Sequence, residues 1–252
     1  MNDRTGFFGA VQFLTRVPVR RAAAADTATI VVWFPVVGAL VGAAVGAMAA
    51  GLGELVPASV AAVVAVLTGV LITGAFHEDG LADTADAVAG GWTVERRLEI
   101  LKDPRHGSYG VAALCGSIVL RVVAVAALGP AAAFSGLVAA HALGRGAAVA
   151  TMGLVPVARP DGLGAEFARS VGLGRATSAA AVSLAIAALA TGWWVGPLAA
   201  SAVVAALAVT FVARRAFGGI TGDILGAIEQ VAECLVLVTL TGLAARHDVW
   251  WT

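Results

Sequence analysis

Charged residues are scarce in this sequence: Asp, Glu, Lys and Arg make up only 13% of the chain. Sixteen acidic residues balance sixteen basic ones, so the formal net charge is zero. A protein that binds nucleic acid through its phosphates carries an excess of Lys and Arg. The composition therefore predicts no nucleic-acid partner.

Cysteine is nearly absent as well. Cys115 and Cys234 lie far apart, each inside an apolar run. Two such residues have neither the spacing of a zinc site nor the number that a disulfide framework needs. Both are interpreted as small, buried apolar side chains.

The start of the chain does not read as a secretory signal, because its apolar stretch is short and is followed by three arginines within 16–21. Phe7, Val11 and Leu14 recur at helical spacing instead. An amphipathic segment of this kind typically lies in the membrane interface. We therefore expect an N-terminal interfacial helix.

Small and aliphatic residues are abundant. Hydrophobic residues make up 60% of the chain and the mean hydropathy is +0.91, whereas an ordinary soluble domain is roughly 45–50% apolar. Small residues let helices approach closely in lipid, where packing drives their association. The composition therefore predicts an integral membrane protein, with the lipid bilayer as its surroundings.

Seven apolar runs are long enough to cross a bilayer, which takes about 20 residues. They cover 30–51, 55–76, 109–129, 131–153, 176–195, 197–213 and 224–244. The predicted fold class is all-α: a polytopic membrane helix bundle of about seven transmembrane helices, with an interfacial helix and a helical cytoplasmic loop. No internal repeat is evident, so residues 1–252 are treated as one integral membrane domain.

The basic residues predict the orientation. With the N-terminus in the cytoplasm, the cytoplasmic segments are 1–29, 77–108, 154–175 and 214–223. Thirteen of the sixteen Lys and Arg residues then lie on the cytoplasmic side, as the positive-inside rule requires. We expect a multi-pass protein of the cell membrane with segment 77–108 in the cytoplasm.

Segment 77–108 contains an unusual acidic cluster. Asp79, Asp83 and Asp86 are spaced i, i+4, i+7, which places three carboxylates on one helical face. Like charges at this spacing repel unless a cation lies between them. Mg²⁺ prefers a few carboxylates together with substrate phosphates, so a magnesium site is predicted here. A solvated acidic loop is the plain alternative. His77, without a second His at ligand spacing, is expected to form hydrogen bonds.

The stretch that follows mixes both signs of charge. Arg96, Lys102 and Arg105 lie close behind the aspartates, where basic side chains can hold a phosphorylated substrate. Arg96, Glu99 and Asp103 share one helical face, which fits equally well with a surface helix held by ion pairs.

A second acidic element is 218–223, where Thr221 or Asp223 can cap the last span. Glu229, Gln230 and Glu233 follow within that span, and charges inside a membrane mark a functional cavity or pair with one another. Arg121 and Arg145 lie at similar depth and are the available partners. These residues predict a polar chamber between the helices that opens to the cytoplasm.

Several of these segments resemble the motifs of one enzyme family, in the same order along the chain. The segments are 13–18, 34–38, 76–86, 95–105, 158–164 and 218–223, and 76–86 reads Phe-His-Glu-Asp-Gly-Leu-Ala-Asp-Thr-Ala-Asp. They look like the signatures of the cobalamin synthase (adenosylcobinamide-GDP ribazoletransferase) family. Gln230 is a departure, because the family pattern has Glu there.

The resemblance implies a Mg²⁺-dependent enzyme that joins adenosylcobinamide-GDP to α-ribazole, or to its 5′-phosphate, and releases GMP. It implies an active site facing the cytoplasm, and a homo-oligomer is left open. Three groups of site residues follow. The catalytic set is Asp79, Asp83, Asp86 and Asp103; the metal set is Asp79, Asp83, Asp86 and Asp223; the substrate-binding set is His77, Arg96, Lys102, Arg105, Arg145, Thr221 and Glu233.

Two other functions compete with this one. A CDP-alcohol phosphotransferase also carries aspartates spaced on helices, but Phe76 stands where that family's pattern has its first Asp. A cation transporter can bind ions through acids inside a bundle. Such a transporter holds its acids near the midplane, whereas these gather in a predicted loop.

Overall fold

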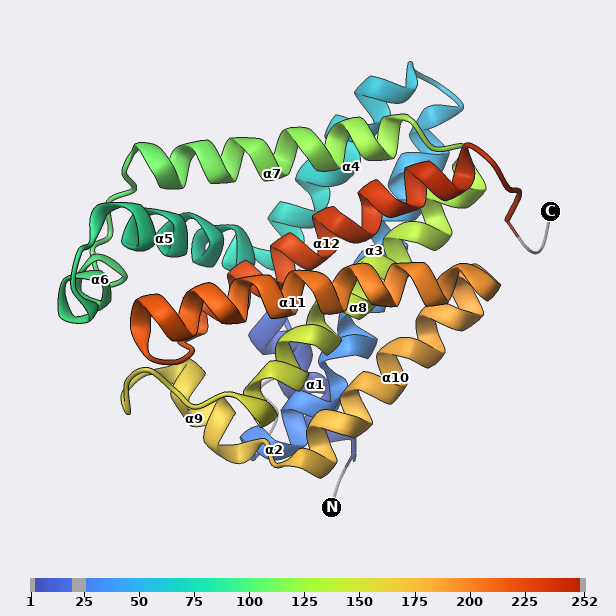
Figure 1. Ribbon diagram of the computed structural model, residues 1–252. Helices are drawn as coiled ribbons and strands as arrows, with labels where there is room; N and C mark the ends of the chain where they lie inside the picture. Colours follow the sequence, from blue (N-terminus) through green and yellow to red (C-terminus); the bar gives the residue numbers. More distant parts are fainter. Residues whose placement is uncertain (1–2, 20–25, 250–252) are drawn as a thin grey trace.

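The computed structural model describes residues 3–19 and 26–249, and this part of the chain is all-α with no strand (Figure 1). Arg20 and Arg21 of the predicted cytoplasmic N-terminus lie outside the described residues. The helices, in chain order, are α1 (Asp3–Leu14), α2 (Thr27–Ile30), η1 (Val31–Trp33), α3 (Phe34–Gly53), α4 (Ala58–Thr73), α5 (Phe76–Gly90), α6 (Val94–Ile100), α7 (Ser108–Ala126), α8 (Pro130–Leu154), α9 (Leu163–Ser170), α10 (Leu173–Thr191), η2 (Gly192–Trp194), α11 (Val195–Phe217) and α12 (Gly222–Ala244).

Each of the seven predicted spans corresponds to one helix: α3, α4, α7, α8, α10, α11 and α12. Five helical stretches of the described chain are long and apolar enough to cross a membrane, or six if α4 and α5 together form one span. One of the five, Leu173–Phe217, contains both α10 and α11, which meet at η2 and diverge from it (Figure 1). The polytopic membrane bundle is thus confirmed, while the number of seven stays a prediction.

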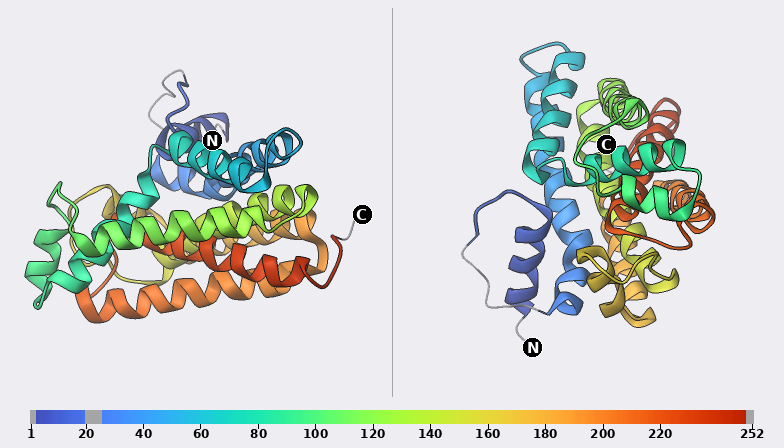
Figure 2. Two further views of the ribbon diagram at one scale, coloured as in Figure 1. Left: turned by 90° about the horizontal axis from the view of Figure 1, so that it is seen from above. Right: turned by 90° about the vertical axis from the view of Figure 1, so that its left-hand side faces the viewer.

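Helix α8 forms the centre of the bundle, and 17 of its 25 residues are buried. Helices α3, α10 and α12 pack around it. Gly38, Gly42 and Gly46 place the backbone of α3 directly against α8, since a Cβ at any of them would collide with it. This is the close approach that small residues allow in membranes. Figure 2 shows α7, α12 and α11 side by side along the molecule.

A sharp bend separates α4 from α5. The two helix axes differ by 89°, and the chain turns through Gly74 and Ala75, which both have left-handed backbone conformations (φ 67° and 59°). Helix α5 therefore leaves the direction of α4 and packs against α7 and α12. The segment predicted as a helical loop is helical, but its first helix belongs to the bundle and its second, α6, lies at the surface.

The segments that we predicted to be cytoplasmic meet at one end of the molecule. Arg97 of α6 donates to the carbonyl of Ala216 at the end of α11 (3.1 Å). Lys102 and Asp161 form an ion pair (3.4 Å), and Val157 pairs with Ile220 in a single β-bridge. In Figure 1 this end, with α5, α6 and α9, lies at the left and lower left.

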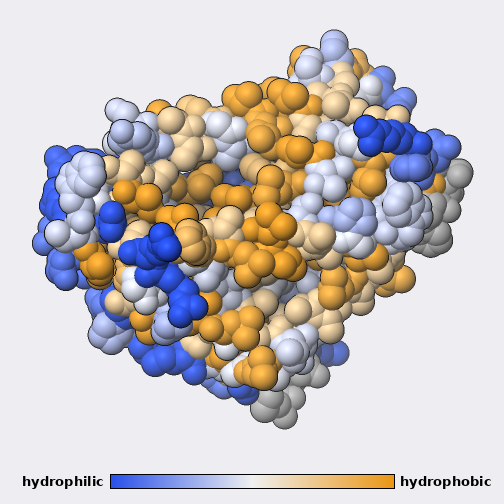
Figure 3. Space-filling view, in the orientation of Figure 1, coloured by the Kyte–Doolittle hydropathy of each residue, from blue (hydrophilic) through white to orange (hydrophobic). Residues whose placement is uncertain are grey.

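Exposed apolar side chains form a band across the molecule, between hydrophilic regions at its ends (Figure 3). Helix α11 contributes Val203, Val204, Leu207 and Phe211, each more than half exposed. An exposed apolar surface of this extent is costly in water but favourable against lipid tails. The band therefore supports the membrane location that composition predicted.

Candidate active site

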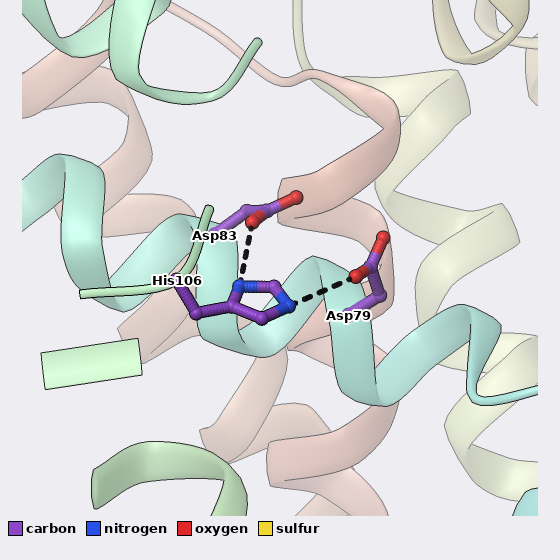
Figure 4. Close-up of side chains that lie close together, drawn as sticks. All are labelled: Asp79, Asp83 and His106. Carbon is purple, nitrogen blue, oxygen red and sulfur yellow. Dashed lines mark ion pairs between the residues drawn. The ribbon is translucent and has the colours of Figure 1, made fainter. Parts of the chain in front are cut away.

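Two of the predicted aspartates converge on a histidine. Asp79 and Asp83, one turn apart on α5, lie on either side of His106, which precedes α7 (Figure 4). His106 Nε2 is 3.4 Å from Asp79 Oδ1, and His106 Nδ1 is 3.3 Å from Asp83 Oδ1. One ligand atom of each residue lies within 4.8 Å of the others. The three side chains therefore form an acidic cluster that could bind a metal ion, and we call it the acidic cluster below.

Asp86 faces a different environment from the other two aspartates. It is buried, and its carboxylate accepts the backbone N–H groups of Gly107 (2.6 Å) and Gly110 (2.8 Å). Those amides belong to the start of α7, where helical N–H groups lack partners within the helix. Asp86 thus acts as a cap that joins α5 to α7, and both of its oxygens are already engaged.

The second acidic motif lies directly against the first. A Cβ on Gly80 of α5 would be 2.7 Å from the carbonyl oxygen of Asp223, so only glycine permits this contact. Thr221 caps α12 by accepting the N–H of Ile224, and its hydroxyl donates to Asp223 (3.3 Å). Asp223 therefore lies against the aspartate helix, as a metal set that includes both Asp79 and Asp223 requires, although the two segments are more than 130 residues apart.

Arg159 is a basic residue that the sequence reasoning missed. Its guanidinium lies 3.9 Å from Asp223 and is only 19% exposed. It belongs to the motif 158–164, so the motif itself was the signal that could have found it. The geometry places a cation beside Asp223 at the edge of a cavity.

The predicted phosphate-binding residues lie further out. Arg96 pairs with Glu99 (3.0 Å), Lys102 with Asp161 (3.4 Å), and Arg105 with Asp103 (2.8 Å). All three basic side chains are largely exposed. Their ion-pair partners are therefore Glu99, Asp161 and Asp103, not the acidic cluster.

Asp103 is engaged by the arginine two residues later. Arg105 donates to both carboxylate oxygens, and these hydrogen bonds lower the pKa of Asp103 to about 2. The carboxylate of Asp103 therefore stays ionised at physiological pH and is held by its own neighbour. The structure does not bring Asp103 into the acidic cluster.

A buried ion network extends from this site into the bundle. Arg121 of α7 lies between Glu78 of α5 (3.0 Å) and Glu233 of α12 (3.2 Å), and all three side chains are less than 5% exposed. Buried charges are tolerated only when they are paired and hydrogen-bonded. The network therefore fixes three helices relative to one another.

Arg145 of α8 completes this network. It forms an ion pair with Glu229 of α12, whose other oxygen lies 3.7 Å from His77. His141 faces Glu233 at 3.1 Å, and His141, Glu229 and Glu233 also have metal-ligand spacing. The predicted pairing of the span acids with Arg121 and Arg145 is confirmed. Gln230 is buried and donates to Glu229 (2.9 Å).

A cavity of about 250 Å³ lies between the acidic cluster and the buried ion network. Asp79, Asp223 and Arg159 line it on the side of the acidic cluster, and Arg145 and Glu229 line its deep part. Much of the remaining wall is apolar and includes four phenylalanines: Phe13, Phe34, Phe76 and Phe167. Of the predicted site residues, His77, Asp79, Arg145, Thr221 and Asp223 line this cavity, whereas Glu233 lies behind it.

Fold and site together define the class: a multi-pass membrane protein with charged groups gathered around one cavity at the end where its polar segments meet. Comparison with known families is specific. The chain belongs to the cobalamin-5-phosphate synthase family, whose model matches residues 6–241.

Curated relatives agree with this family over nearly the whole chain. A protein of Azorhizobium caulinodans is 40% identical over 253 residues, covering 94% of this chain and 96% of the relative. One of Bradyrhizobium diazoefficiens is 43% identical, covering 91% and 90%, and one of Chlorobaculum tepidum is 36% identical, covering 92% and 93%. All three are named adenosylcobinamide-GDP ribazoletransferase. No solved structure matches the chain.

These findings confirm the resemblance of the six motifs to the cobalamin synthase family. They favour it over the CDP-alcohol phosphotransferase and the cation transporter. The chain is a member of a family of cobalamin-synthesising enzymes.

Proposed function

We propose that this protein is an adenosylcobinamide-GDP ribazoletransferase. It would transfer adenosylcobinamide phosphate from adenosylcobinamide-GDP to α-ribazole or its 5′-phosphate, the last step in assembling the nucleotide loop of cobalamin. The observation that carries this proposal is the match to the family over residues 6–241, together with relatives of that name.

The proposed reaction exchanges one phosphorus–oxygen bond for another. A ribose hydroxyl of the acceptor attacks the phosphorus on the cobinamide side of the diphosphate, and a new P–O bond forms. The anhydride bond breaks and its electron pair leaves with GMP, while the proton of the hydroxyl passes to a base. Adenosylcobalamin, or its 5′-phosphate, is the product.

A divalent metal ion fits the acidic cluster. Asp79 and Asp83 offer carboxylate oxygens close together, with Asp223 across the contact at Gly80. Oxygen ligands of this kind favour Mg²⁺, whereas a coordinating imidazole at His106 would favour a transition metal. We assign Mg²⁺, which when bound neutralises charge on the diphosphate oxygens. His106 would then hold the two carboxylates in place as a hydrogen-bond partner.

The protein's own residues have three tasks in this proposal. Asp79, Asp83 and Asp223 hold the metal and face the diphosphate, and one of these carboxylates takes the proton. Arg159, with Arg96 of α6 and Lys102 and Arg105 of the segment after it, neutralises phosphate oxygens. Arg145 and Thr221 hold polar atoms of the substrate inside the cavity, while Asp86, Asp103, His77 and Glu233 keep these groups in position through their own partners.

We also propose that this end of the molecule faces the cytoplasm. Thirteen basic residues lie in segments 1–29, 77–108, 154–175 and 214–223. Excess Lys and Arg near span ends stay on the cytoplasmic side. Nucleotide substrates and GMP are cytoplasmic molecules, which agrees with this orientation.

The direct test is GMP release by the purified protein in detergent or lipid, supplied with adenosylcobinamide-GDP and α-ribazole. We expect one GMP per corrinoid joined, no release without the acceptor, and loss of activity on chelation that added Mg²⁺ restores. Hydrolysis of the donor at the same rate without α-ribazole would contradict a transferase. Full activity after chelation would contradict the metal assignment alone.

A further inference from the structure

The cavity beside the acidic cluster is small compared with the molecules that this reaction joins. Its volume is about 250 Å³, below the roughly 300–1,000 Å³ of typical small-molecule sites. The inference that follows rests on the proposed function, which requires two substrates of very different size. A corrin macrocycle with its adenosyl and guanosine diphosphate groups is several times too large, whereas a single nucleoside is of the right order.

Part of the cavity wall is a cluster of four phenylalanines from four helices that pack on one another, and we call this cluster the aromatic box. Phe13 of α1 stacks on Phe34 of α3 with an interplanar angle of 5° and ring centroids 5.5 Å apart. Phe167 of α9 lies 4.6 Å from Phe13, and Phe76 of α5 lies edge-on to Phe13 at 5.3 Å. Aromatic faces gathered in this way favour a flat aromatic ligand.

The polarity of the box decides between the two bases that the reaction involves. Leu14, Ala148 and Met152 line the cavity and belong to the same apolar cluster as Phe34 and Phe167, whereas His77 contacts Phe76 and brings one polar ring to the edge of the box. Guanine carries donors and acceptors along its edge, and burying them without partners is costly. The dimethylbenzimidazole of α-ribazole has an apolar, methylated edge, so it loses little when it lies against this apolar wall.

Asp79 connects this cavity to the acidic cluster. Its side chain lines the cavity, and its Oδ1 also lies 3.4 Å from His106. Asp223 and Arg159 line the same side of the cavity. An acceptor whose base lies against the phenylalanines therefore has its ribose next to the carboxylates, at the point where the diphosphate of the other substrate would arrive.

We propose that this cavity is the acceptor site: it binds the nucleoside with its benzimidazole against the phenylalanines and its ribose beside Asp79 and Asp223. The corrinoid donor stays outside the cavity and presents only its diphosphate at the acidic cluster. Phe13 and Phe167 are then specificity-determining residues for the acceptor.

The test separates the two substrates kinetically. Phe13→Leu and Phe167→Leu remove a ring but keep an apolar side chain, and Phe13 is only half-buried, so that variant is the safer one for folding. Phe217→Leu is the matched control, because Phe217 is 1% exposed in the same core region but does not line the cavity. Loss of ring contacts should raise the KM for α-ribazole about tenfold, with the KM for adenosylcobinamide-GDP within about twofold of the unaltered protein. The control should leave both KM values unchanged.

Each other outcome overturns the assignment. A raised KM for adenosylcobinamide-GDP in the two test variants would place the guanine or the corrinoid in the cavity. Unchanged KM values for both substrates would show that the box binds neither. Absence of GMP release by the unaltered protein would overturn the proposed function itself. GMP release by the unaltered protein, with unchanged KM values in the variants, would overturn only the assignment of the acceptor site. Equilibrium dialysis of α-ribazole alone against the unaltered protein should show saturable binding that Phe13→Leu weakens.

Discussion

At the scale of single residues, the aspartates of α5 differ in what surrounds them. Asp79 is 62% exposed and Asp83 is 14% exposed, and each has one oxygen near His106. Asp86, less than one turn further on, is buried with both oxygens bound to backbone amides. Residues of the same type on one helix therefore have different tasks, and substitution should separate them.

Asp79→Asn and Asp83→Asn should each abolish GMP release, by at least a hundredfold, while the protein stays folded and inserted. The amide keeps the shape of the side chain but removes the charge that Mg²⁺ coordination needs. Removing repulsion between like charges leaves the melting temperature unchanged or slightly higher. Glu95→Gln, an exposed acid in α6, is the control and should keep full activity. Near-normal turnover of both Asp variants at saturating Mg²⁺ would exclude these carboxylates as the metal site.

Asp86→Asn should act on stability. Asn accepts only one of the two hydrogen bonds from Gly107 and Gly110 and points an N–H₂ group at the other amide. Loss of a hydrogen bond to a buried charged group costs about 2 kcal/mol, which lowers the melting temperature by about 5 °C in a protein of this size. Thermal unfolding in detergent measures this, with Asp83→Asn as the matched comparison. An unchanged melting temperature together with a lost response to Mg²⁺ would instead make Asp86 a metal ligand.

Residue spacing predicted part of the site and missed the rest for a clear reason. Spacing along one helix placed Asp79 and Asp83 together, since i and i+4 share a face. It gave no sign of His106, which comes from a loop more than 20 residues away. Nor could it distinguish Asp86, whose partners are backbone amides that any sequence supplies.

At the scale of helices, the contact between α5 and α12 decides whether the two acidic motifs form one site. Gly80→Ala adds a methyl group 2.7 Å from the carbonyl oxygen of Asp223, which is too close. We expect the helices to separate, at a cost of about 1–3 kcal/mol, and GMP release to fall at least tenfold. Gly90→Ala on the same helix is the control, because its Cβ would meet only Ile100 at 3.5 Å.

Activity and melting temperature measured for both glycine variants test this contact. A fully active Gly80→Ala protein would show that the metal and diphosphate do not need Asp223 next to α5. A Gly90→Ala protein as impaired as Gly80→Ala would show that the effect belongs to α5 as a whole.

The helices themselves were largely predictable, because runs of about 20 apolar residues have few alternatives to a spanning helix. The sharp turn between α4 and α5 was not. It depends on Ala75 in a left-handed conformation that non-glycine residues rarely adopt. The acids that follow were therefore expected in a loop, whereas the turn carries them back against α12.

At the scale of the whole molecule, the segments rich in Arg and Lys gather at one end, with α5, α6 and α9. We expect a cysteine at Thr93, an exposed residue before α6, to react with an impermeant maleimide in inside-out vesicles but not in right-side-out ones. The positive-inside rule gives the direction. Cys115 is exposed, so the prediction that it is buried was wrong, whereas Cys234 is buried as predicted; both should first be replaced by Ala.

A cysteine at Glu54, at the opposite end between α3 and α4, is the control for this labelling and should show the reverse pattern. Labelling of Thr93→Cys in right-side-out vesicles would place the candidate site on the wrong side of the membrane for its nucleotide substrates. Equal labelling in both preparations would mean that the vesicles leak, and the Glu54→Cys result would reveal it.

Charge distribution predicted which segments share a side, but not how closely they meet. The pairs Arg97–Ala216, Lys102–Asp161 and Val157–Ile220 join parts of the chain 59 or more residues apart. Such contacts depend on helix crossing angles, which a hydropathy pattern does not contain. The cavity depends on them too, so its aromatic box was visible in the sequence only as separate motifs.

The buried ion network has a consequence for biosynthesis. The chain enters the membrane from its N-terminus, so Arg121 and Arg145 arrive well before Glu229 and Glu233, which lie on the last helix. Until α12 is inserted, Arg121 has Glu78 as its carboxylate partner, and Arg145 lacks Glu229. An unpaired arginine in lipid is costly, so the final helix supplies the carboxylates that compensate both arginines and also brings Asp223 to the candidate active site.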